Sequence, residues 1–243
     1  MTDATPCLGE IDVVVLAGGL GSRIQGTLGD TPKILAPIGD RVFLDILLSR
    51  LIHFGGKRVV LGLGHLGKKV VAHLETNAPT GLTIVTAIEA SPLGTAGALR
   101  FLAPRFKSDP VMIMNGDSFI GADLCKFIAR HRASKAEASI LTAKVKDTAQ
   151  YGRIKISRQQ KIEEFLEKDA GIPGPGIINA GVYLFNASML SKIAAMGGAS
   201  LEKNVFQALP AATLGAISGT GPFIDIGTPA DLARAPKVLK PYF

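Results

Sequence analysis

The sequence predicts an α/β fold with a Rossmann-like, mixed and mostly parallel sheet flanked by helices. Two observations lead to this prediction. First, apolar β-branched runs alternate with amphipathic stretches along the first half of the 243-residue chain, which is the order of elements in parallel α/β proteins. Second, the early runs are apolar at every position instead of at alternate ones, as expected of strands that are covered on both faces.

Strands and helices are expected to alternate through the first half of the chain. The predicted strands are Ile11–Ala17, Arg58–Leu63, Leu82–Ala87, Val111–Asn115 and Ala138–Val145. The predicted helices are Val42–Phe54, Gly67–Thr76, Thr95–Phe106 and Ala122–Ser134. Within the first of these helices the apolar residues Phe43, Ile46, Leu47 and Leu51 recur at helical spacing, which places them on one face.

The second half of the chain has a different character. A polar hairpin is predicted over Tyr151–Phe165, and the Pro/Gly-rich run Gly171–Gly176 is expected to form a loop. The remaining predicted elements are a strand at Ile177–Phe185 and helices at Leu201–Leu209 and Pro229–Val238. Because no linker or internal repeat divides the chain, we expect one domain over residues 1–243, in which residues from about 136 to 243 cover a binding surface formed by about 1–135.

Charge and composition narrow the classes of partner. The chain has 27 lysines and arginines against 20 acidic residues, a net charge of +7. Tryptophan is absent and no aromatic residues interleave the short basic clusters, so small phosphorylated substrates are favoured over nucleic acid. No apolar run is long enough to span a bilayer, and no basic segment precedes the first run. We therefore expect a cytoplasmic protein with no membrane and no nucleic-acid partner.

Cysteine and histidine usage gives no sign of a metal or disulfide framework. Cys7 and Cys125 are far apart and form no Cys-x-x-Cys pair, so we expect two free thiols in a reducing compartment. The histidines lack the spacing of metal ligands and are expected to be structural or surface residues. They are His53, His65, His73 and His131.

A glycine-rich turn directly follows the first predicted strand. Gly18, Gly19 and Gly21 end the apolar run VVVLA, at the edge of an α/β sheet where ligands collect. Glycines allow successive backbone N–H groups to approach an anion closely. A tight turn without any ligand is the alternative at this stage.

Two familiar phosphate-binding loops do not fit this turn. The Gly-Lys-Ser/Thr of a Walker A loop is missing, and Ile24 stands where the third glycine of a dinucleotide-binding loop belongs. The expected ribose-binding acid is also missing, which disfavours a dinucleotide-dependent oxidoreductase.

Two cations lie close to the glycine turn in the sequence. Arg23 follows the turn, and Lys33 comes directly after a stiffening proline. Two fixed cations beside a glycine turn favour a triphosphate and the pyrophosphate that departs from it.

The same stretch resembles a known family. LAGGLGSR at 16–23, followed by TPKILAPIG at 31–39, resembles the N-terminal signature of the sugar-nucleotide pyrophosphorylases, which are nucleotidyltransferases acting on sugar 1-phosphates. Ser22 and Ile24 replace the family's common Thr and Leu. Further family-like motifs follow in the family's order across nearly the whole chain: PLGTAG at 92–97, NGD at 115–117, YG at 151–152, EK at 167–168, NAGVY at 179–183 and DIGTP at 225–229. Asp169 departs from the proline that many members have after EK.

The resemblance implies a GT-A-like fold and a role for each motif. The catalytic set would be Arg23, Lys33, Asp117, Lys168 and Asp225. The nucleotide would contact Leu16, Ala17, Gly18, Gly19, Gly21, Arg23, Lys33, Glu89, Gly94, Thr95, Asn115 and Gly116. The sugar would contact Gly152, Glu167, Lys168 and Asn179, in a C-terminal hairpin region that forms the sugar-binding half.

Three carboxylates are expected to bind a metal ion or the nucleotide base. By the resemblance, Asp117 and Asp225 bind one Mg²⁺, which prefers oxygen ligands and takes one or two carboxylates plus substrate phosphates. Helix N-capping is the alternative for both residues. Glu89 has a carboxylate that can accept two N–H groups of a guanine, which favours GTP. An exposed loop acid is the alternative for Glu89.

The substrate is the most specific expectation. SPLGTAGALR, INAGVYLF and SLEKNVFQALP are most similar to bacterial D-glycero-α-D-manno-heptose 1-phosphate guanylyltransferases, which implies GTP, GDP-heptose and surface polysaccharide such as capsule. Mannose 1-phosphate guanylyltransferase and N-acetylmuramate 1-phosphate uridylyltransferase remain alternatives, as does a non-catalytic nucleotide-sugar sensor. Relatives often form dimers, so a homodimer is an additional expectation.

Overall fold

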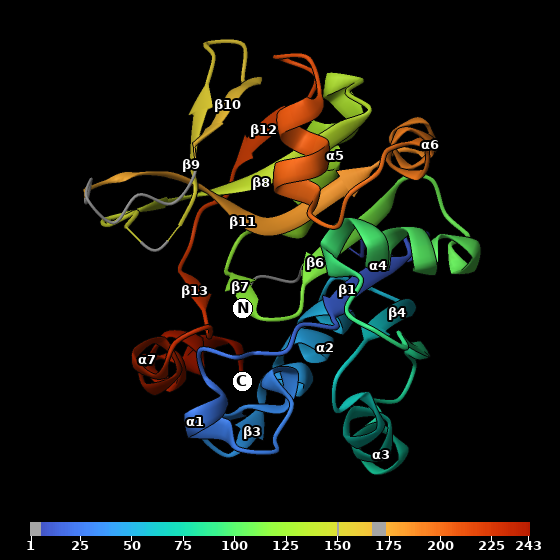
Figure 1. Ribbon diagram of the computed structural model, residues 1–243, viewed down its shortest axis with the longest axis vertical. Helices are drawn as coiled ribbons and strands as arrows, with labels where there is room; N and C mark the ends of the chain where they lie inside the picture. The colour runs from blue at the N-terminus through green and yellow to red at the C-terminus, as the bar shows by residue number, and fades with distance from the viewer. Residues whose placement is uncertain (1–5, 150, 167–173) are drawn as a thin grey trace.

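The computed structural model describes residues 6–149, 151–166 and 174–243, arranged around one large twisted sheet (Figure 1). The sheet has nine strands, with the path β10-β9-β11-β6-β1-β4-β5 and with β8 joining β11 to β12. The strands are β1 (Val13–Ala17), β4 (Arg58–Leu63), β5 (Thr83–Ile88), β6 (Val111–Asn115), β8 (Ala138–Val145), β9 (Arg153–Ile156), β10 (Ile162–Leu166), β11 (Gly176–Phe185) and β12 (Gly215–Ser218). Strands β6, β1, β4 and β5 run parallel, whereas β11 is antiparallel to β6, β8 and β9. The predicted mixed α/β architecture is confirmed.

Helices cover both faces of the sheet. They are α1 (Gln25–Leu28), α2 (Phe43–His53), α3 (Gly67–Asn77), α4 (Gly94–Leu102), α5 (Leu124–Ser134), α6 (Ala187–Ala195) and α7 (Pro229–Leu239). Short helical turns are η1 (Lys33–Leu35), η2 (Ala103–Arg105), η3 (Leu201–Val205), η4 (Phe206–Ala208) and η5 (Lys240–Tyr242). Two small ribbons complete the described structure: β2 (Pro37–Ile38) with β3 (Arg41–Val42), and β7 (Ser118–Ile120) with β13 (Phe223–Asp225). None of the helices in these described segments is long and apolar enough to cross a bilayer.

The continuous apolar pattern of β1 follows from burial on both faces. Val13 and Val15 belong to the core cluster under α2, α3, α5 and α7, whereas Val14 and Leu16 belong to the cluster under α4 and α6. Successive side chains of a strand point to opposite faces. Both sets are therefore apolar, as the sequence pattern predicted.

Several predicted boundaries differ from the structure. The helix expected at Thr95–Phe106 ends at Leu102 and continues as η2, where Pro104 lacks an N–H for a helical hydrogen bond. The helix expected at Leu201–Leu209 is the irregular pair η3 and η4. Strands β7, β12 and β13 were not predicted, because three- and four-residue strands are too short to show a period. Helix α6 was not predicted either.

Cys7 and Cys125 form a disulfide, so the prediction of two free thiols is wrong. Their Cα atoms are 5.5 Å apart despite a sequence separation of 118 residues. The N-terminal segment is fixed at this place because the backbone N–H groups of Cys7 and Leu8 both donate to the carbonyl of Phe54. Cys125 lies in the first turn of α5, and the Arg50 guanidinium donates to the carbonyl of Ala122 just before that helix.

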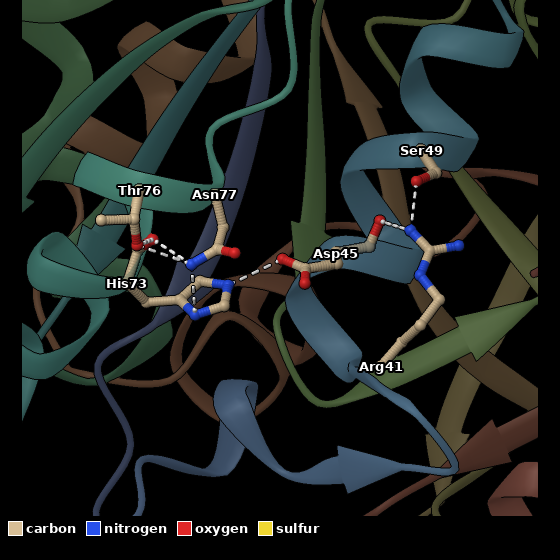
Figure 2. A network of polar contacts seen from close by, with 6 residues as sticks. All are labelled: Arg41, Asp45, Ser49, His73, Thr76 and Asn77. Carbon is tan, nitrogen blue, oxygen red and sulfur yellow. Dashed lines mark hydrogen bonds and ion pairs between the residues drawn. The ribbon is translucent and has the colours of Figure 1, made fainter.

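A polar network joins α2 and α3 at the periphery of the fold (Figure 2). The Nε2 atom of His73 lies 2.8 Å from Oδ1 of Asp45. Arg41 donates to the Asp45 carbonyl over 2.9 Å, and Asn77 donates to the His73 carbonyl over the same distance. His73 is thus placed as a structural residue. His131 is also structural, because it is buried and its two ring nitrogens lie within hydrogen-bond distance of Ser139 and Asn186.

Candidate active site

A cavity of about 190 Å³ opens at the carboxyl ends of β1 and β6. Glycines and charged residues make up most of its lining. The lining residues are Leu16, Ala17, Gly19, Gly21, Ser22, Arg23, Pro32, Lys33, Ile34, His65, Gly116, Asp117 and Gly227. Most of the residues expected to bind the nucleotide are therefore brought together here, although they come from three separated stretches of sequence.

Glycines shape this cavity by allowing close approach and unusual backbone angles. Gly21 has a φ of 63°, in the left-handed region that favours glycine. At Gly116, an added Cβ would lie 2.9 Å from both the Leu16 carbonyl oxygen and the Ala17 Cβ. The turn after β6 therefore lies directly against the end of β1, where a larger residue would not fit.

Lys33 and two carboxylates form a charged cluster at the edge of the cavity. The Lys33 Nζ lies 2.7 Å from Oδ2 of Asp117 and 3.8 Å from Oδ1 of Asp225. The Lys33 side chain is only 14% exposed, whereas those of Asp117 and Asp225 are 39% and 28% exposed. One half-buried ammonium thus partly neutralises two carboxylates that a ligand can still reach.

The small β7–β13 ribbon brings these carboxylates together across 108 positions of sequence. Asp225 is paired with Ser118 in the ribbon, and the Ile226 N–H donates to the Asp117 carbonyl over 2.9 Å. The N–H of Gly227 donates to Oδ1 of Asp225 over 2.6 Å, which fixes the orientation of that carboxylate. The ribbon therefore sets the spacing of the pair through backbone hydrogen bonds.

The capping alternative for the two aspartates does not hold. Helix α5 is capped by Asp123, whose side chain accepts from the Lys126 N–H. Helix α7 is capped by Thr228, whose side chain accepts from the Asp231 N–H. Within the described residues, therefore, neither Asp117 nor Asp225 caps a helix.

Electrostatics at the pair favour a bound cation. Burial raises the pKa of Asp225 to about 6, and the negative charge of Asp117 adds to the rise. Lys33, the Gly227 N–H and Arg23 act in the opposite direction. The residues fit Mg²⁺, because the available donors are carboxylate oxygens. The described residues contain no cluster of three or more His, Cys, Asp or Glu suited to a metal, so among them this pair of carboxylates is the candidate ligand set.

A second cavity, of about 300 Å³, lies on the other side of the carboxylates. Its lining residues are Asn115, Tyr151, Gly152, Phe165, Leu166, Asn179, Ser200, Glu202, Lys203, Gln207 and Asp225. Asn115 and Asp225 line this cavity, while their neighbours Gly116, Asp117 and Gly227 line the first. The aspartates therefore lie at the junction of the two cavities.

Hydrogen bonds organise the wall of the second cavity. Asn179 accepts from the Gly181 N–H with Oδ1 and donates to the Tyr183 hydroxyl over 2.8 Å. The Tyr183 hydroxyl in turn donates to Oε1 of Glu202 over 3.2 Å. Burial raises the pKa of Tyr183 well above its usual value, so this phenol stays protonated. The wall presents donors and acceptors suited to a polyol.

Glu89 lies beneath the glycine turn. It is only 8% exposed, which excludes the exposed loop acid. An added Cβ on Gly64 would lie 2.8 Å from Oε1 of Glu89, and one on Gly18 would also collide with this carboxylate. Burial raises the pKa of Glu89, and a hydrogen bond from the Leu93 backbone opposes this. Glu89 therefore fits in this position only because residue 18 is a glycine.

The remaining expected residues fall into three groups. Gly152, Asn179 and Asn115 line the second cavity. Gly94 and Thr95 lie at the start of α4, beyond the lining of both cavities within the described part of the chain. Glu167 and Lys168 lie outside the described residues.

Other lining residues were missed by sequence reasoning. His65 lines the first cavity, and Tyr151, Ser200 and Glu202 line the second. Tyr151 could have been included, because it belongs to the family-like motif YG at 151–152. Glu202 lies in a stretch that reads as an ordinary amphipathic helix, and nothing local distinguishes its carboxylate from a surface one.

Comparison with known proteins finds a matching family and similar enzymes. Residues 12–240 match the family described as nucleotidyl transferase. The chain is 32% identical over 234 residues to a D-glycero-α-D-manno-heptose 1-phosphate guanylyltransferase of Aneurinibacillus thermoaerophilus, covering 96% of this chain and 100% of the relative. It is 32% identical over 228 residues to a mannose-1-phosphate guanylyltransferase of Mycobacterium tuberculosis, covering 93% of this chain but only 63% of that enzyme.

A solved structure is similar over the same region. HddC from Yersinia pseudotuberculosis matches with a TM-score of 0.83 and 29% identity, covering 93% of this chain and 98% of HddC. HddC complexed with GMP-PN matches with a TM-score of 0.82. The likeness thus extends over most of the length of both chains.

Proposed function

Since this chain belongs to the nucleotidyl transferase family, we propose that it transfers a guanylyl group from GTP to a sugar 1-phosphate. A phosphate oxygen of the sugar 1-phosphate attacks the α-phosphorus of GTP and forms a new P–O bond. The bond from the α-phosphorus to the bridging oxygen breaks, and pyrophosphate leaves. The observation that carries this proposal is the Asp117–Asp225 pair at the junction of two cavities, one lined by the glycine turn and the other by polyol-binding groups.

The first cavity is assigned to the nucleotide. The turn at Gly19 and Gly21, together with Arg23 and Lys33, lines the same space. These fixed donors and cations stabilise the triphosphate and the charge that grows on the departing pyrophosphate. The attacking phosphate is already a nucleophile, so positioning and charge stabilisation account for the reaction without a general base.

The aspartates are assigned to a divalent cation. Asp117 and Asp225 would hold Mg²⁺, together with phosphate oxygens of the substrates. When bound, the ion supplies charge neutralisation between the two phosphates that must approach each other. Lys33, which lies against both carboxylates, limits their repulsion when no cation is present.

The second cavity is assigned to the sugar. Asn179, Glu202 and the backbone at Gly152 offer hydrogen-bonding groups to its hydroxyls. The family resemblance assigns Lys168 to the phosphate of the sugar 1-phosphate and Glu167 to a sugar hydroxyl. Both assignments remain predictions to be tested by substitution.

The substrate pair is assigned from the relatives. The heptose 1-phosphate guanylyltransferase of A. thermoaerophilus is aligned along its whole length, and HddC was solved with GMP-PN. We therefore favour GTP and D-glycero-α-D-manno-heptose 1-phosphate, with GDP-heptose directed to surface polysaccharide. Mannose 1-phosphate is the second candidate, because the mycobacterial relative is named for it and is equally identical.

Formation of the nucleotide-sugar tests the proposal. Purified protein is incubated with GTP, Mg²⁺ and heptose 1-phosphate or mannose 1-phosphate, and GDP-sugar is measured by anion-exchange chromatography. We expect GDP-heptose. GDP-heptose binding without any turnover would instead support the nucleotide-sugar sensor.

A further inference from the structure

Helix α4 begins at the turn that the family resemblance assigns to the nucleotide. The polar groups of this turn, however, form hydrogen bonds with a segment that lines the second cavity. The Thr95 Oγ1 accepts a hydrogen bond from the Leu201 N–H over 2.8 Å. The next residue, Ala96, donates its own N–H to the Ala199 carbonyl over 2.8 Å. Two hydrogen bonds therefore join the start of α4 to the segment 199–201, more than 100 residues later.

The same helix holds the preceding residues of that segment. The Arg100 guanidinium donates to the carbonyls of Ile193, Met196 and Gly198, at and beyond the end of α6. Gly94 lies so close to Ala199 that an added Cβ would be 2.8 Å from the Ala199 Cβ. Helix α4 packs against α6 as well as against β1 (Figure 1). Residues 193–201 are thus held along one side of α4.

This segment carries part of the wall of the second cavity. Ser200 and Glu202 line that cavity, while Leu201 between them is fully buried. The Ser200 hydroxyl donates to Oε2 of Glu202 over 3.2 Å, and the Tyr183 hydroxyl donates to Oε1. Because Leu201 is fixed by its side chain in the core and by its N–H on Thr95, the backbone that carries Glu202 has little freedom.

We propose that Thr95 is a positioning residue for the sugar cavity, acting through the Leu201 N–H on Ser200 and Glu202. The inference rests on the proposed function for the identity of the ligands. It differs from the family-based expectation, in which Thr95 binds the nucleotide. The Thr95 hydroxyl sets the affinity for the sugar 1-phosphate, and the affinity for GTP is independent of it.

Two substitutions separate these roles. Valine has nearly the same shape as threonine, so Thr95→Val removes only the hydroxyl that accepts from the Leu201 N–H. Thr95→Ser keeps this hydroxyl. We expect Thr95→Val to raise KM for the sugar 1-phosphate about fivefold, the effect of one lost net hydrogen bond, while KM for GTP changes less than about twofold. Thr95→Ser should restore the wild-type KM. Thr213→Val is the matched control, because the Thr213 hydroxyl donates over 2.7 Å to the carbonyl of nearby Pro210 and Thr213 lines neither cavity.

A second measurement reads the hydrogen bond itself. Amide hydrogen exchange at Leu201 should be faster in Thr95→Val than in wild type and Thr95→Ser, with Leu99 as an internal reference in α4. A rise in KM for GTP with an unchanged sugar KM would overturn the inference, as would unchanged exchange at Leu201. Failure of the wild-type protein to turn over any substrate pair would instead overturn the proposed function. The exchange result, and sugar 1-phosphate binding measured by calorimetry, would then still decide the role of Thr95.

Discussion

The ammonium of Lys33 lies 2.7 Å from the carboxylate of Asp117, at the junction of two cavities. This contact places a protein cation where the proposed reaction needs positive charge. A divalent cation that binds both Asp117 and Asp225 repels the ammonium, so we expect Lys33 to turn toward substrate phosphate oxygens when the ion binds. We therefore expect Lys33 to pair with the aspartates in the free protein and with the triphosphate in the complex.

Replacing Asp225 with Asn should abolish most turnover without unfolding the protein. Asn keeps an Oδ1 acceptor for the Gly227 N–H but removes the charge that holds a cation. We expect kcat to fall on the order of 100-fold, measured as pyrophosphate release at saturating GTP and Mg²⁺. Asp117→Asn should have a similar effect, and near-normal rates in either variant would contradict a shared cation site.

The pH dependence of stability tests the same pair in metal-free protein. The pKa of Asp225 is raised from 3.8 to about 6 in the folded state, so the folded protein holds this proton more tightly than the unfolded chain. Its contribution to the free energy of unfolding is therefore fully present below pH 4 and is lost as pH rises toward 6. Urea unfolding in EDTA should show this decline in wild type and not in Asp225→Asn. Identical pH profiles would argue against the raised pKa.

Gly227→Ala tests how tightly the cluster is packed. An added Cβ would lie 2.6 Å from Oδ1 of Asp225 and 3.2 Å from the Lys33 Nζ, so the carboxylate must move. We expect kcat/KM to fall at least about tenfold, because small displacements of reacting groups are costly. Gly26→Ala is the control, since nothing lies within 4 Å of its added Cβ. Equal activity of the two variants would show that the carboxylate position is not critical.

The parts of the fold that were predictable are those with a local pattern. β1, β4, β6 and β8 have long apolar runs and were found within two residues of their observed bounds. The ribbon of β7 and β13 was not found, because each strand has three residues and pairs with a segment that is distant in the sequence. The proximity of Asp117 and Asp225 therefore came from the family resemblance, not from the pattern of residues.

The same limit applies to the missed features. Glu202 enters the second cavity through the irregular turn η3, which local sequence reads as a regular helix. The Cys7–Cys125 disulfide depends on two segments that meet only in the folded chain. In both cases the feature depends on tertiary contacts, which the local sequence pattern does not show.

Base selectivity should depend on Glu89. If its carboxylate accepts guanine N–H groups, Glu89→Gln should lower kcat/KM for GTP about 10- to 100-fold, because hydrogen bonds to a charged acceptor are strong. Gln has nearly the same volume, so the packing against Gly18 and Gly64 is retained. Glu75→Gln on the exposed face of α3 is the control. An unchanged ratio of GTP to UTP use would remove Glu89 from base recognition.

The disulfide should contribute to global stability. Closing a loop over a separation of 118 residues is expected to add about 5 kcal/mol to the free energy of unfolding by restricting the unfolded chain. Reductant should therefore lower Tm of the wild-type protein and leave Tm of the Cys7→Ser/Cys125→Ser variant unchanged. Titration of two free thiols in unreduced, denatured wild-type protein would contradict the bond.

The most direct test of the central assignment is pyrophosphate release with Mg²⁺ over a grid of four NTPs and four sugar 1-phosphates. The sugars are heptose, mannose, glucose and N-acetylmuramate. We predict release with GTP and heptose 1-phosphate, and at a lower rate with GTP and mannose 1-phosphate. Release with UTP instead of GTP would overturn the base assignment, and absence of release from every pair would contradict a nucleotidyltransferase built on Asp117 and Asp225.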